Sequence, residues 1–292
     1  MMKSFFKYIA YLVVFIVFQL YLLDYIYTTI YVNATPRDKV SWMKSMKTQD
    51  NFDYIVLGSS RSIHHINPIQ VSELSNKNGL NLGYAASGSF EIKLMLKAFF
   101  KNNSAKKVFV QVDENFNNIK PKKLAQVTWM PFIKEKDIYE EFIKHDKIYW
   151  KYKYLPFYRY QKFEPKIGVR NVSLSLINKT PNFIENKGFV PIFGEIKIDK
   201  PISLKIIRKS NINFKEIIKF CNSKNIEITF FTSPIYNQKN NFNLLSNYLP
   251  NYYDLSNSVK NKKYFKDQTH LNALGAEEFT KIFTQYFLTE KP

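Results

Sequence analysis

The chain is poor in cysteine: its 292 residues include only Cys221. A single cysteine excludes an intrachain disulfide framework and any zinc site built on cysteine ligands, and we expect Cys221 to be a small buried apolar residue. The sequence also has no internal repeat and no low-complexity tract. A hydrophobic fraction of 45%, with 17% aromatic residues, excludes a chain that is disordered throughout. The length therefore predicts a packed core, in one large domain or two small ones.

Acidic residues are scarce as well. The 24 aspartates and glutamates face 43 lysines and arginines, which gives a formal net charge of +19. Such a surface attracts anionic partners, namely nucleic acid, anionic lipid headgroups or acidic polymers. A codon bias that enriches lysine together with asparagine, isoleucine, phenylalanine and tyrosine accounts for the excess equally well. Charge alone therefore assigns no partner.

One long apolar run lies near the N-terminus, from Phe5 to Leu23, with Lys7 as its only charge. As a helix it would rise about 28 Å at roughly 1.5 Å per residue, close to the thickness of a bilayer's hydrocarbon core. Lys3 and Lys7 precede the run, so the positive-inside rule predicts a cytoplasmic N-terminus and export of everything after Asp24.

Two other interpretations of this run are open. A signal peptide would be cleaved near Val32 and Ala34, although the apolar stretch is longer than a usual signal core. A buried helix of a soluble protein is the second alternative. We favour a single-pass membrane anchor whose extracytoplasmic body, periplasmic or at the cell surface, has no nucleic-acid partner.

Short apolar runs alternate with helical patterns in the rest of the chain. The expected strands are 54–58, 80–84, 108–112 and 226–234, and the expected helices are 67–75, 90–101, 214–222 and 277–287. This alternation predicts an α/β fold with a parallel sheet covered on both faces. We expect an anchor in residues 1–31, a linker in 32–51 and an α/β domain in 52–292, interrupted by an insertion at about 121–201.

Basic and aromatic residues interleave within the insertion, from Lys147 to Phe163. On an exported protein this pattern is typical of a sugar-binding platform or of a surface that lies on anionic membrane. The alternative is an insertion that packs its aromatic rings into a core and leaves its lysines in solvent.

The first motif is the run LGSSR at Leu57 to Arg61, immediately after the first expected strand of the body. Gly58 permits a tight turn there, and Ser60 then lies at the carboxyl end of a strand, where open α/β sheets place their sites. Free backbone N–H groups near such a serine can receive negative charge. A serine that only forms a turn or caps a helix is the alternative.

The second motif is DQTHLN, from Asp267 to Asn272, just before the last helix. The spacing of Asp267 and His270 puts both side chains on one face of a helical turn. A carboxylate in that position can bind one ring nitrogen of His270 and leave the other directed at a nucleophile. The alternative is a helix N-terminal aspartate beside a surface histidine.

Together the two motifs resemble the first and last sequence blocks of the SGNH (GDSL-like) hydrolase superfamily. The resemblance covers roughly residues 51–118 and 214–287. It implies a flavodoxin-like three-layer sandwich with a central parallel sheet, preceded by the transmembrane helix. It also implies a nucleophile at Ser60, a general base at His270 and an orienting carboxylate at Asp267.

The resemblance further implies an oxyanion hole. Ser60 supplies one backbone N–H, and the family's second block corresponds to Asn81 through Gly88, where we choose Gly88 with Ala86 or Gly83 as alternatives. The family's Gly-x-Asn-Asp block is not found after the third strand. Asn115 is the candidate for that donor, with a surface-loop role as the alternative.

A second departure concerns the residue before the nucleophile. Ser59 stands where many members have aspartate, a change shared by membrane-anchored relatives that work in teichoic-acid D-alanylation and polysaccharide O-acetylation. We therefore expect a serine-dependent O-acyltransferase or esterase that acts on a cell-envelope polymer, with an acyl donor and a polymer acceptor. The alternatives are a non-catalytic scaffold that binds polymer or partners a multi-pass membrane acyltransferase, and a lipase-like esterase.

Few other residues carry chemistry. Arg61 follows the nucleophile and is a candidate for binding an anionic substrate, with a structural ion pair as the alternative. His64 and His65 are adjacent, so their side chains diverge and do not form a metal site. His145 lies in the insertion, where we expect it to be exposed. We expect no metal and no cofactor.

Overall fold

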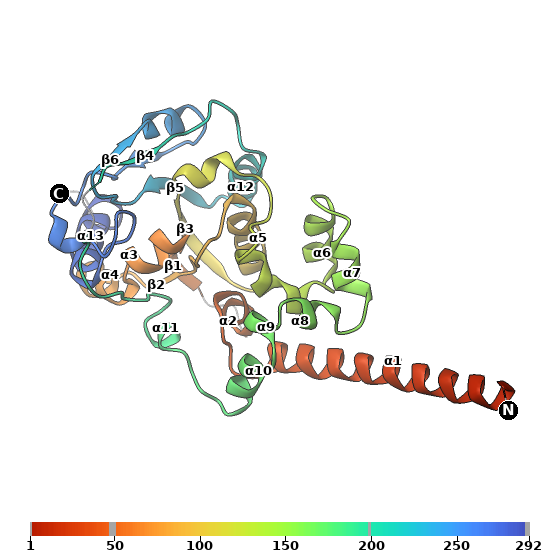
Figure 1. Cartoon of the computed structure of the whole chain (residues 1–292). Helices are drawn as coiled ribbons and strands as arrows, with labels where there is room; N and C mark the ends of the chain where they lie inside the picture. The colour runs from red at the N-terminus through yellow and green to blue at the C-terminus, as the bar shows by residue number, and fades with distance from the viewer. Residues whose placement is uncertain (1, 47–50, 198–199, 290–292) are drawn as a thin grey trace. The chain divides into compact units, whose positions relative to one another are not determined.

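The computed structural model of the chain describes residues 2–46, 51–197 and 200–289 (Figure 1). By its internal packing the chain divides into two compact units. Residues 1–45 and 126–180 form the N-terminal unit, and residues 46–125 and 181–292 form the sheet unit.

The sheet unit is built on five parallel strands in the order β2-β1-β3-β5-β7. The strands are β1 (Asn51–Leu57), β2 (Gly79–Asn81), β3 (Ser104–Gln111), β5 (Glu227–Thr232) and β7 (Tyr252–Asp254). This is the strand order of flavodoxin-like folds, which bind ligands beyond the carboxyl ends of the strands where the order reverses, between β1 and β3. The predicted α/β fold with a central parallel sheet is confirmed.

Helices cover both faces of this sheet (Figure 1). Phe231 contacts Phe283 of α13 with ring centroids 5.4 Å apart, whereas its neighbour Phe230 contacts Phe214 of α12 at 5.9 Å. Because successive residues of a strand point to opposite faces, α13 and α12 lie on opposite sides. The first side carries α3 (Ser60–His65), α4 (Pro68–Ser75) and α13 (Ala273–Phe287), and the second carries α5 (Ser89–Phe99) and α12 (Ile212–Ser223).

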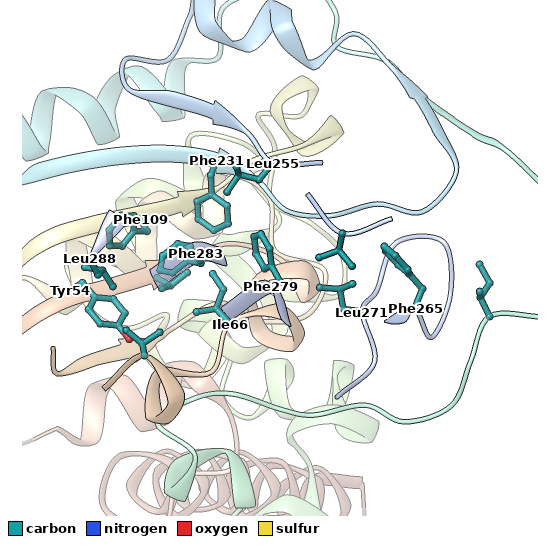
Figure 2. Close-up of a cluster of buried hydrophobic side chains, with 14 residues drawn as sticks. Tyr54, Ile66, Phe109, Phe231, Leu255, Phe265, Leu271, Phe279, Phe283 and Leu288 are labelled. Atoms are coloured by element: carbon teal, nitrogen blue, oxygen red, sulfur yellow. The ribbon is translucent and has the colours of Figure 1, made fainter. Parts of the chain in front are cut away.

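The main hydrophobic cluster lies between the sheet and α13 (Figure 2). Tyr54 and Phe109 line it from the strands, and Phe279 and Phe283 line it from the helix. The cluster continues beyond the strands to Leu271, the residue that follows the second motif. The core therefore fixes the position of the loop that carries Asp267 and His270.

Shorter elements complete the sheet unit. They are η1 (Glu114–Asn117), α11 (Asn182–Glu185), η3 (Phe242–Asn247), η4 (Lys262–Tyr264) and a separate parallel pair, β4 (Ile202–Leu204) with β6 (Gln238–Asn240).

The N-terminal unit is helical. It contains α1 (Met2–Asn33), α2 (Lys39–Ser45), most of η2 (Ala125–Phe132), α6 (Lys136–Ile143), α7 (Tyr149–Tyr154), α8 (Tyr158–Lys162), α9 (Glu164–Ile167) and α10 (Val169–Leu176). Helix α1 is long and apolar enough to cross a membrane, and its apolar side chains are mostly exposed. An anchor and a signal sequence both have these properties.

A buried ion pair joins α1 to residues 126–180 inside this unit. Asp24 and Arg159 are 1% and 0% exposed. Their side chains form two hydrogen bonds, Nη1 to Oδ2 at 2.7 Å and Nη2 to Oδ1 at 3.1 Å. The same carboxylate also accepts from Lys134 and from the backbone N–H of Phe157. The carboxylate of Asp24 is thus neutralised and hydrogen-bonded, as a buried charge requires.

All eight strands and helices predicted for the α/β domain are present, with shifted ends, and other elements were missed. The last helix begins at Ala273 instead of 277, because Asn272 caps it by accepting from the N–H of Gly275 at 3.0 Å. Helix α3 and the short strands β4, β6 and β7 were not predicted. The segment expected to be a linker contains α2, while its residues 47–50, and residues 198–199 of the expected insertion, lie outside the described residues. The predicted domain boundaries stay predictions.

The Asp24–Arg159 pair yields a stability prediction. Replacing Asp24 with Ala leaves the buried guanidinium of Arg159 without its counter-ion, which costs about 3–5 kcal/mol. We expect a lower thermal unfolding midpoint of the full chain in detergent, followed by near-UV circular dichroism. The double variant Asp24→Leu/Arg159→Met, which removes both charges, should recover most of the loss; an unchanged midpoint in Asp24→Ala would show that the pair does not form.

Candidate active site

Ser60 begins the short helix α3, directly beyond the carboxyl end of β1. The turn between them requires glycine at position 58, where φ is +153° and a Cβ atom would lie 2.7 Å from Cβ of Gln111. Ser59 then caps α3 by accepting from the N–H of Arg61. The turn and cap place Ser60 in the first turn of the helix, partly exposed at the sheet edge.

Asp267 and His270 lie in a loop before α13 rather than on a helical turn. One carboxylate oxygen of Asp267 accepts the backbone N–H groups of Thr269 at 2.8 Å and of His270 at 2.9 Å. Gly275 permits this loop to approach α13 closely, since a Cβ there would lie 2.1 Å from the carbonyl oxygen of Tyr264. The predicted proximity of the two side chains therefore holds, but a turn closed by the carboxylate itself produces it.

The three side chains meet in one line across 210 residues of sequence. His270 Nε2 lies 2.8 Å from Ser60 Oγ, and His270 Nδ1 lies 2.9 Å from Asp267 Oδ2. The Asp267 side chain is 53% exposed and the His270 side chain 25%. A serine hydroxyl, an imidazole and a carboxylate in this order can activate the hydroxyl as a nucleophile.

The carboxyl of Asp267 is held in its ionised form. Partial burial opposes ionisation, but the hydrogen bonds from His270 and from Thr269 outweigh it and keep the pKa of this carboxyl below its ordinary value of 3.8. An ionised Asp267 fixes the proton of His270 on Nδ1 and leaves Nε2 as an acceptor for the Ser60 hydroxyl.

A buried polar chain that sequence reasoning missed supports the nucleophile turn. Gln111, the last residue of β3, accepts from both the N–H and the hydroxyl of Ser59, at 3.1 and 2.8 Å. Its amide donates to Asp113 at 2.6 Å, and Asp113 pairs with Arg61 at 2.8 Å. The sequence did contain a signal for this role, because Gln111 is a polar residue at the carboxyl end of an apolar strand, where open α/β sheets place their sites.

Arg61 is part of this chain. It is 5% exposed and also donates to both carboxylate oxygens of Glu114 at 2.9 Å. These contacts are those of the structural ion pair that was the alternative for this residue, and binding of an anionic substrate by Arg61 stays a prediction.

The predicted oxyanion donors differ in what their N–H groups already bind. Gly88 caps α5, and its N–H donates to the buried carboxylate of Glu91 at 2.9 Å, so it is occupied within the chain. The N–H of Gly83 donates to Asn81 at 3.1 Å. The backbone N–H of Asn115 donates to Asp113 at 2.7 Å, in the turn after β3. An oxyanion role for Gly88 would require its bond to Glu91 to break.

Ala86 is the better candidate for an oxyanion donor than Gly88, because its backbone N–H is available. It has φ of +61° in the loop after β2, and in the described part of the chain no acceptor binds its N–H. The loop is fastened beside the nucleophile turn, because the hydroxyl of Ser87 and the N–H of Tyr84 both donate to the carbonyl of Gly58, at 2.6 and 3.2 Å.

His65 holds the histidine loop in place. Its Nε2 accepts the N–H of Leu271, the residue after His270, at 3.0 Å. Burial, together with the neighbouring His270, lowers the pKa of His65 well below its ordinary value, which keeps the ring neutral and able to accept. The neighbouring His64 binds the carbonyl of Val190 at 2.7 Å. Both rings contact the His270 ring, with centroids 5.6 and 6.4 Å away, so the two adjacent side chains do not diverge, contrary to the expectation.

Two other candidate residues take no part in these contacts. Cys221 is buried in α12, and burial raises the pKa of its thiol to about 12. His145 is partly exposed in the N-terminal unit. Among residues 2–46, 51–197 and 200–289, no cluster of three or more His, Cys, Asp or Glu side chains is arranged to hold a metal ion.

No protein-family model matches the chain, and no curated protein matches it. Among solved structures it is similar to a candidate platelet activating factor from Streptococcus pneumonia, with 12% identity, a TM-score of 0.39, and coverage of 96% of this chain and 98% of the other. It is also similar to a candidate lipolytic protein of the G-D-S-L family from Desulfitobacterium hafniense, with 11% identity, a TM-score of 0.28, and coverage of 80% and 98%. Likeness at this level carries no argument about activity, which therefore rests on the geometry above.

The buried cap of α5 generates a pH prediction. Burial raises the pKa of Glu91 from 4.5 to about 7, although it accepts the N–H groups of Lys122 and Gly88. Between these values the folded state keeps a proton on Glu91 that the unfolded state has released, so this group makes the free energy of unfolding fall as pH rises from about 5 to about 7. Burial raises the pKa of Asp38 to about 6, which adds a share of the same sign, whereas the lowered pKa of His65 adds a share of the opposite sign. Urea unfolding at several pH values measures the combined slope. We expect Glu91→Gln to make this slope more positive by the Glu91 share and the exposed Glu73→Gln to leave it unchanged; an unchanged slope in Glu91→Gln would contradict the prediction.

Proposed function

We propose that the protein is a serine-dependent acyl-transfer enzyme that forms an acyl ester on Ser60. The observation that carries this proposal is the line of contacts from Ser60 Oγ through the His270 ring to Asp267, at 2.8 and 2.9 Å. All three groups reach solvent at the carboxyl edge of a parallel sheet, where a substrate can approach them.

The reaction proceeds in two halves. His270 Nε2 takes the proton of Ser60 as Oγ bonds to an ester carbonyl carbon, and the same proton passes to the alcohol oxygen when the original ester bond breaks. In the second half His270 takes a proton from water or from a sugar hydroxyl as the oxygen of that group attacks the acyl-serine carbonyl. The same proton then passes from His270 to Ser60 Oγ as the acyl–Oγ bond breaks, which restores the free serine. Water as acceptor gives hydrolysis, and a hydroxyl as acceptor gives transfer.

The negative charge on the carbonyl oxygen needs preorganised donors. We assign the backbone N–H groups of Ser60 and Ala86 to this role, because Ser60 opens a helix and no acceptor binds Ala86 in the described residues. Gly88, our sequence-based choice, already donates to Glu91. The backbone N–H of Asn115 is occupied by Asp113, so its side-chain amide is the group that remains a candidate for a third donor.

The proposed location and the net charge support a substrate class. The net charge of +19 favours an anionic acceptor, and helix α1 would hold the enzyme at a membrane. A cell-envelope polysaccharide or related polymer has hydroxyl groups that can accept an acyl group, and it lies next to the membrane. Acyl transfer to such a polymer, or removal of its esters, is therefore the specific activity that we propose.

We also propose that α1 is retained as a single-pass anchor with its N-terminus in the cytoplasm. Cleavage after Ala34 would remove Asp24 and leave Arg159 buried without its partner. Asp24→Ala removes the same carboxylate, so its expected loss of stability indicates how much stability cleavage would cost. Lys3 and Lys7 before the apolar run support the orientation.

The triad predicts specific losses of activity. The full chain in detergent should release product from a chromogenic acetyl ester, and Ser60→Ala should reduce the rate to background. Asp267→Asn should lower turnover on the order of 10⁴-fold because the imidazole loses its orienting charge. Ser173→Ala, at an exposed serine of the N-terminal unit, is the matched control. Full activity in Ser60→Ala with the fold retained would refute the proposal.

A non-catalytic scaffold, acting beside a multi-pass membrane acyltransferase, predicts a different outcome. Its support is that Gly88 is occupied by Glu91, which weakens the expected oxyanion hole. Under this alternative, Ser60→Ala and His270→Ala would both restore polymer modification in a deletion strain. Under our proposal neither variant restores it.

The role of Ala86 is testable without changing a side chain. Replacing Ala86 with lactic acid turns its amide into an ester and removes only the N–H, which should lower turnover by roughly 10²–10³-fold. The same replacement at Ala85, whose side chain is exposed in the same turn, is the control. Equal effects at the two positions would show that Ala86 holds no oxyanion.

A further inference from the structure

Part of α7 presents large apolar and aromatic side chains to solvent. Trp150 is 50% exposed, Tyr154 51% and Leu155 38%. The rings of Trp150 and Tyr154 contact each other with centroids 5.7 Å apart, and the ammonium group of Lys153 lies 5.3 Å from the Tyr154 ring. We call Trp150, Lys151, Tyr154 and Leu155 the Trp150 face.

The segment that carries this face is strongly basic, although α6, which packs against α7, carries Asp137, Glu140 and Glu141. Residues 147–162 contain five lysines and arginines and no acidic residue. Lys147, Lys151 and Lys162 are exposed, whereas Arg159 is buried against Asp24. Other aromatic residues of the segment, such as Tyr152, pack inside the unit. The exposed set therefore combines Trp, Tyr and Lys, which are the residues enriched where proteins meet the headgroup region of a bilayer.

The Trp150 face lies close to the end of the apolar run of α1. The backbone N–H of Phe157, two residues beyond Leu155, donates to Asp24 at 2.8 Å. The Phe157 ring contacts Tyr27 at 4.9 Å, and Tyr160 bonds the hydroxyl of Thr28 at 2.9 Å. Figure 1 accordingly shows α8 beside the end of α1 that leads to α2.

The positions of the charged residues in α1 indicate how deep in a bilayer these contacts would lie. Residues 8–23 carry no charge and rise about 24 Å as a helix, so Lys7 and Asp24 bracket a hydrocarbon core of about 30 Å when Lys7 extends toward the headgroups. Asp24 thus lies at headgroup depth. Tyr154 is three residues from Phe157, a separation of at most about 10 Å, which keeps the Trp150 face within reach of that layer.

We propose that the Trp150 face binds the outer surface of the same bilayer that α1 spans. Trp150, Tyr154 and Leu155 enter the headgroup layer, and Lys147 and Lys151 pair with the phosphates of anionic phospholipids. This inference requires α1 to span the membrane but does not depend on the chemistry of Ser60.

The fluorescence of Trp150 can be used to test the proposal. The chain has three tryptophans, and the other two, Trp42 and Trp129, are buried. The full chain is reconstituted in nanodiscs of phosphatidylcholine, with or without phosphatidylglycerol, using lipids brominated near the headgroup. We expect the bromines to quench Trp150 fluorescence, more strongly with phosphatidylglycerol, and the quenched component to be absent in Trp150→Phe.

Charge variants test the lipid specificity. Each lysine removed should lower the ratio of docked to undocked states about fivefold, so Lys147→Glu/Lys151→Glu should abolish the phosphatidylglycerol effect. The control Lys215→Glu/Lys219→Glu makes the same charge change at exposed positions of α12. Far-UV circular dichroism verifies that the variants are folded.

Three outcomes would overturn the proposal. Trp150 would be quenched by aqueous acrylamide and not by brominated lipid if the face points into solvent. Equal lipid quenching with and without phosphatidylglycerol would exclude anionic headgroups as the partner. Protection of Trp150 by soluble polyphosphate, without lipid quenching, would identify the face as a binding surface for a polymer.

Discussion

The hydrogen bond between Ser60 and His270 depends on two ends of the chain being held at one edge of the sheet. On one side, β1 pairs with β3 so that Leu57 lies opposite Val110, and Gln111 then reaches the nucleophile turn. On the other side, the aromatic face of α13 packs on the strands, and Leu271 is buried in the same cluster (Figure 2). A separation of 2.8 Å across 210 residues therefore rests on the close packing of the core, which tolerates little displacement.

The sequence predicts those parts of this arrangement in which the local pattern and the fold agree. Strands β1 and β3 contain short apolar runs, YIVL at 54–57 and VFV at 108–110, and β5 is rich in β-branched and aromatic residues. Ser60 follows a parallel strand and Asp267 precedes the last helix, which are positions where such sheets place their sites. Strand β7 was missed because it has three residues and carries the polar Asp254. Helix α3 was missed because its sequence, SRSIHH, has no apolar period, and it forms because Ser59 caps it and Arg61 has buried partners.

The oxyanion donor could not be predicted correctly from the sequence. Gly88 fits a glycine-based pattern, yet Glu91, three residues later, folds back onto its N–H. A glutamate at this position is a common capping residue, but whether it binds the cap depends on burial of the whole turn, which a sequence does not display. In the same way, only the register of β1 and β3 reveals that Gln111 contacts Ser59.

The pairing of Asp24 with Arg159 can form only after a delay, because the two residues are synthesised at different times. The two residues are 135 positions apart, so at roughly 5–20 residues per second the ribosome needs about 7–27 s to add the second after the first. Under the proposal that α1 is a membrane anchor, this helix can enter the bilayer during the interval, while the Asp24 carboxylate still lacks the Arg159 guanidinium. Insertion then precedes tertiary folding of the helical unit, and the nascent chain is tethered to the lipid before it acquires the arginine that fixes the helix in place.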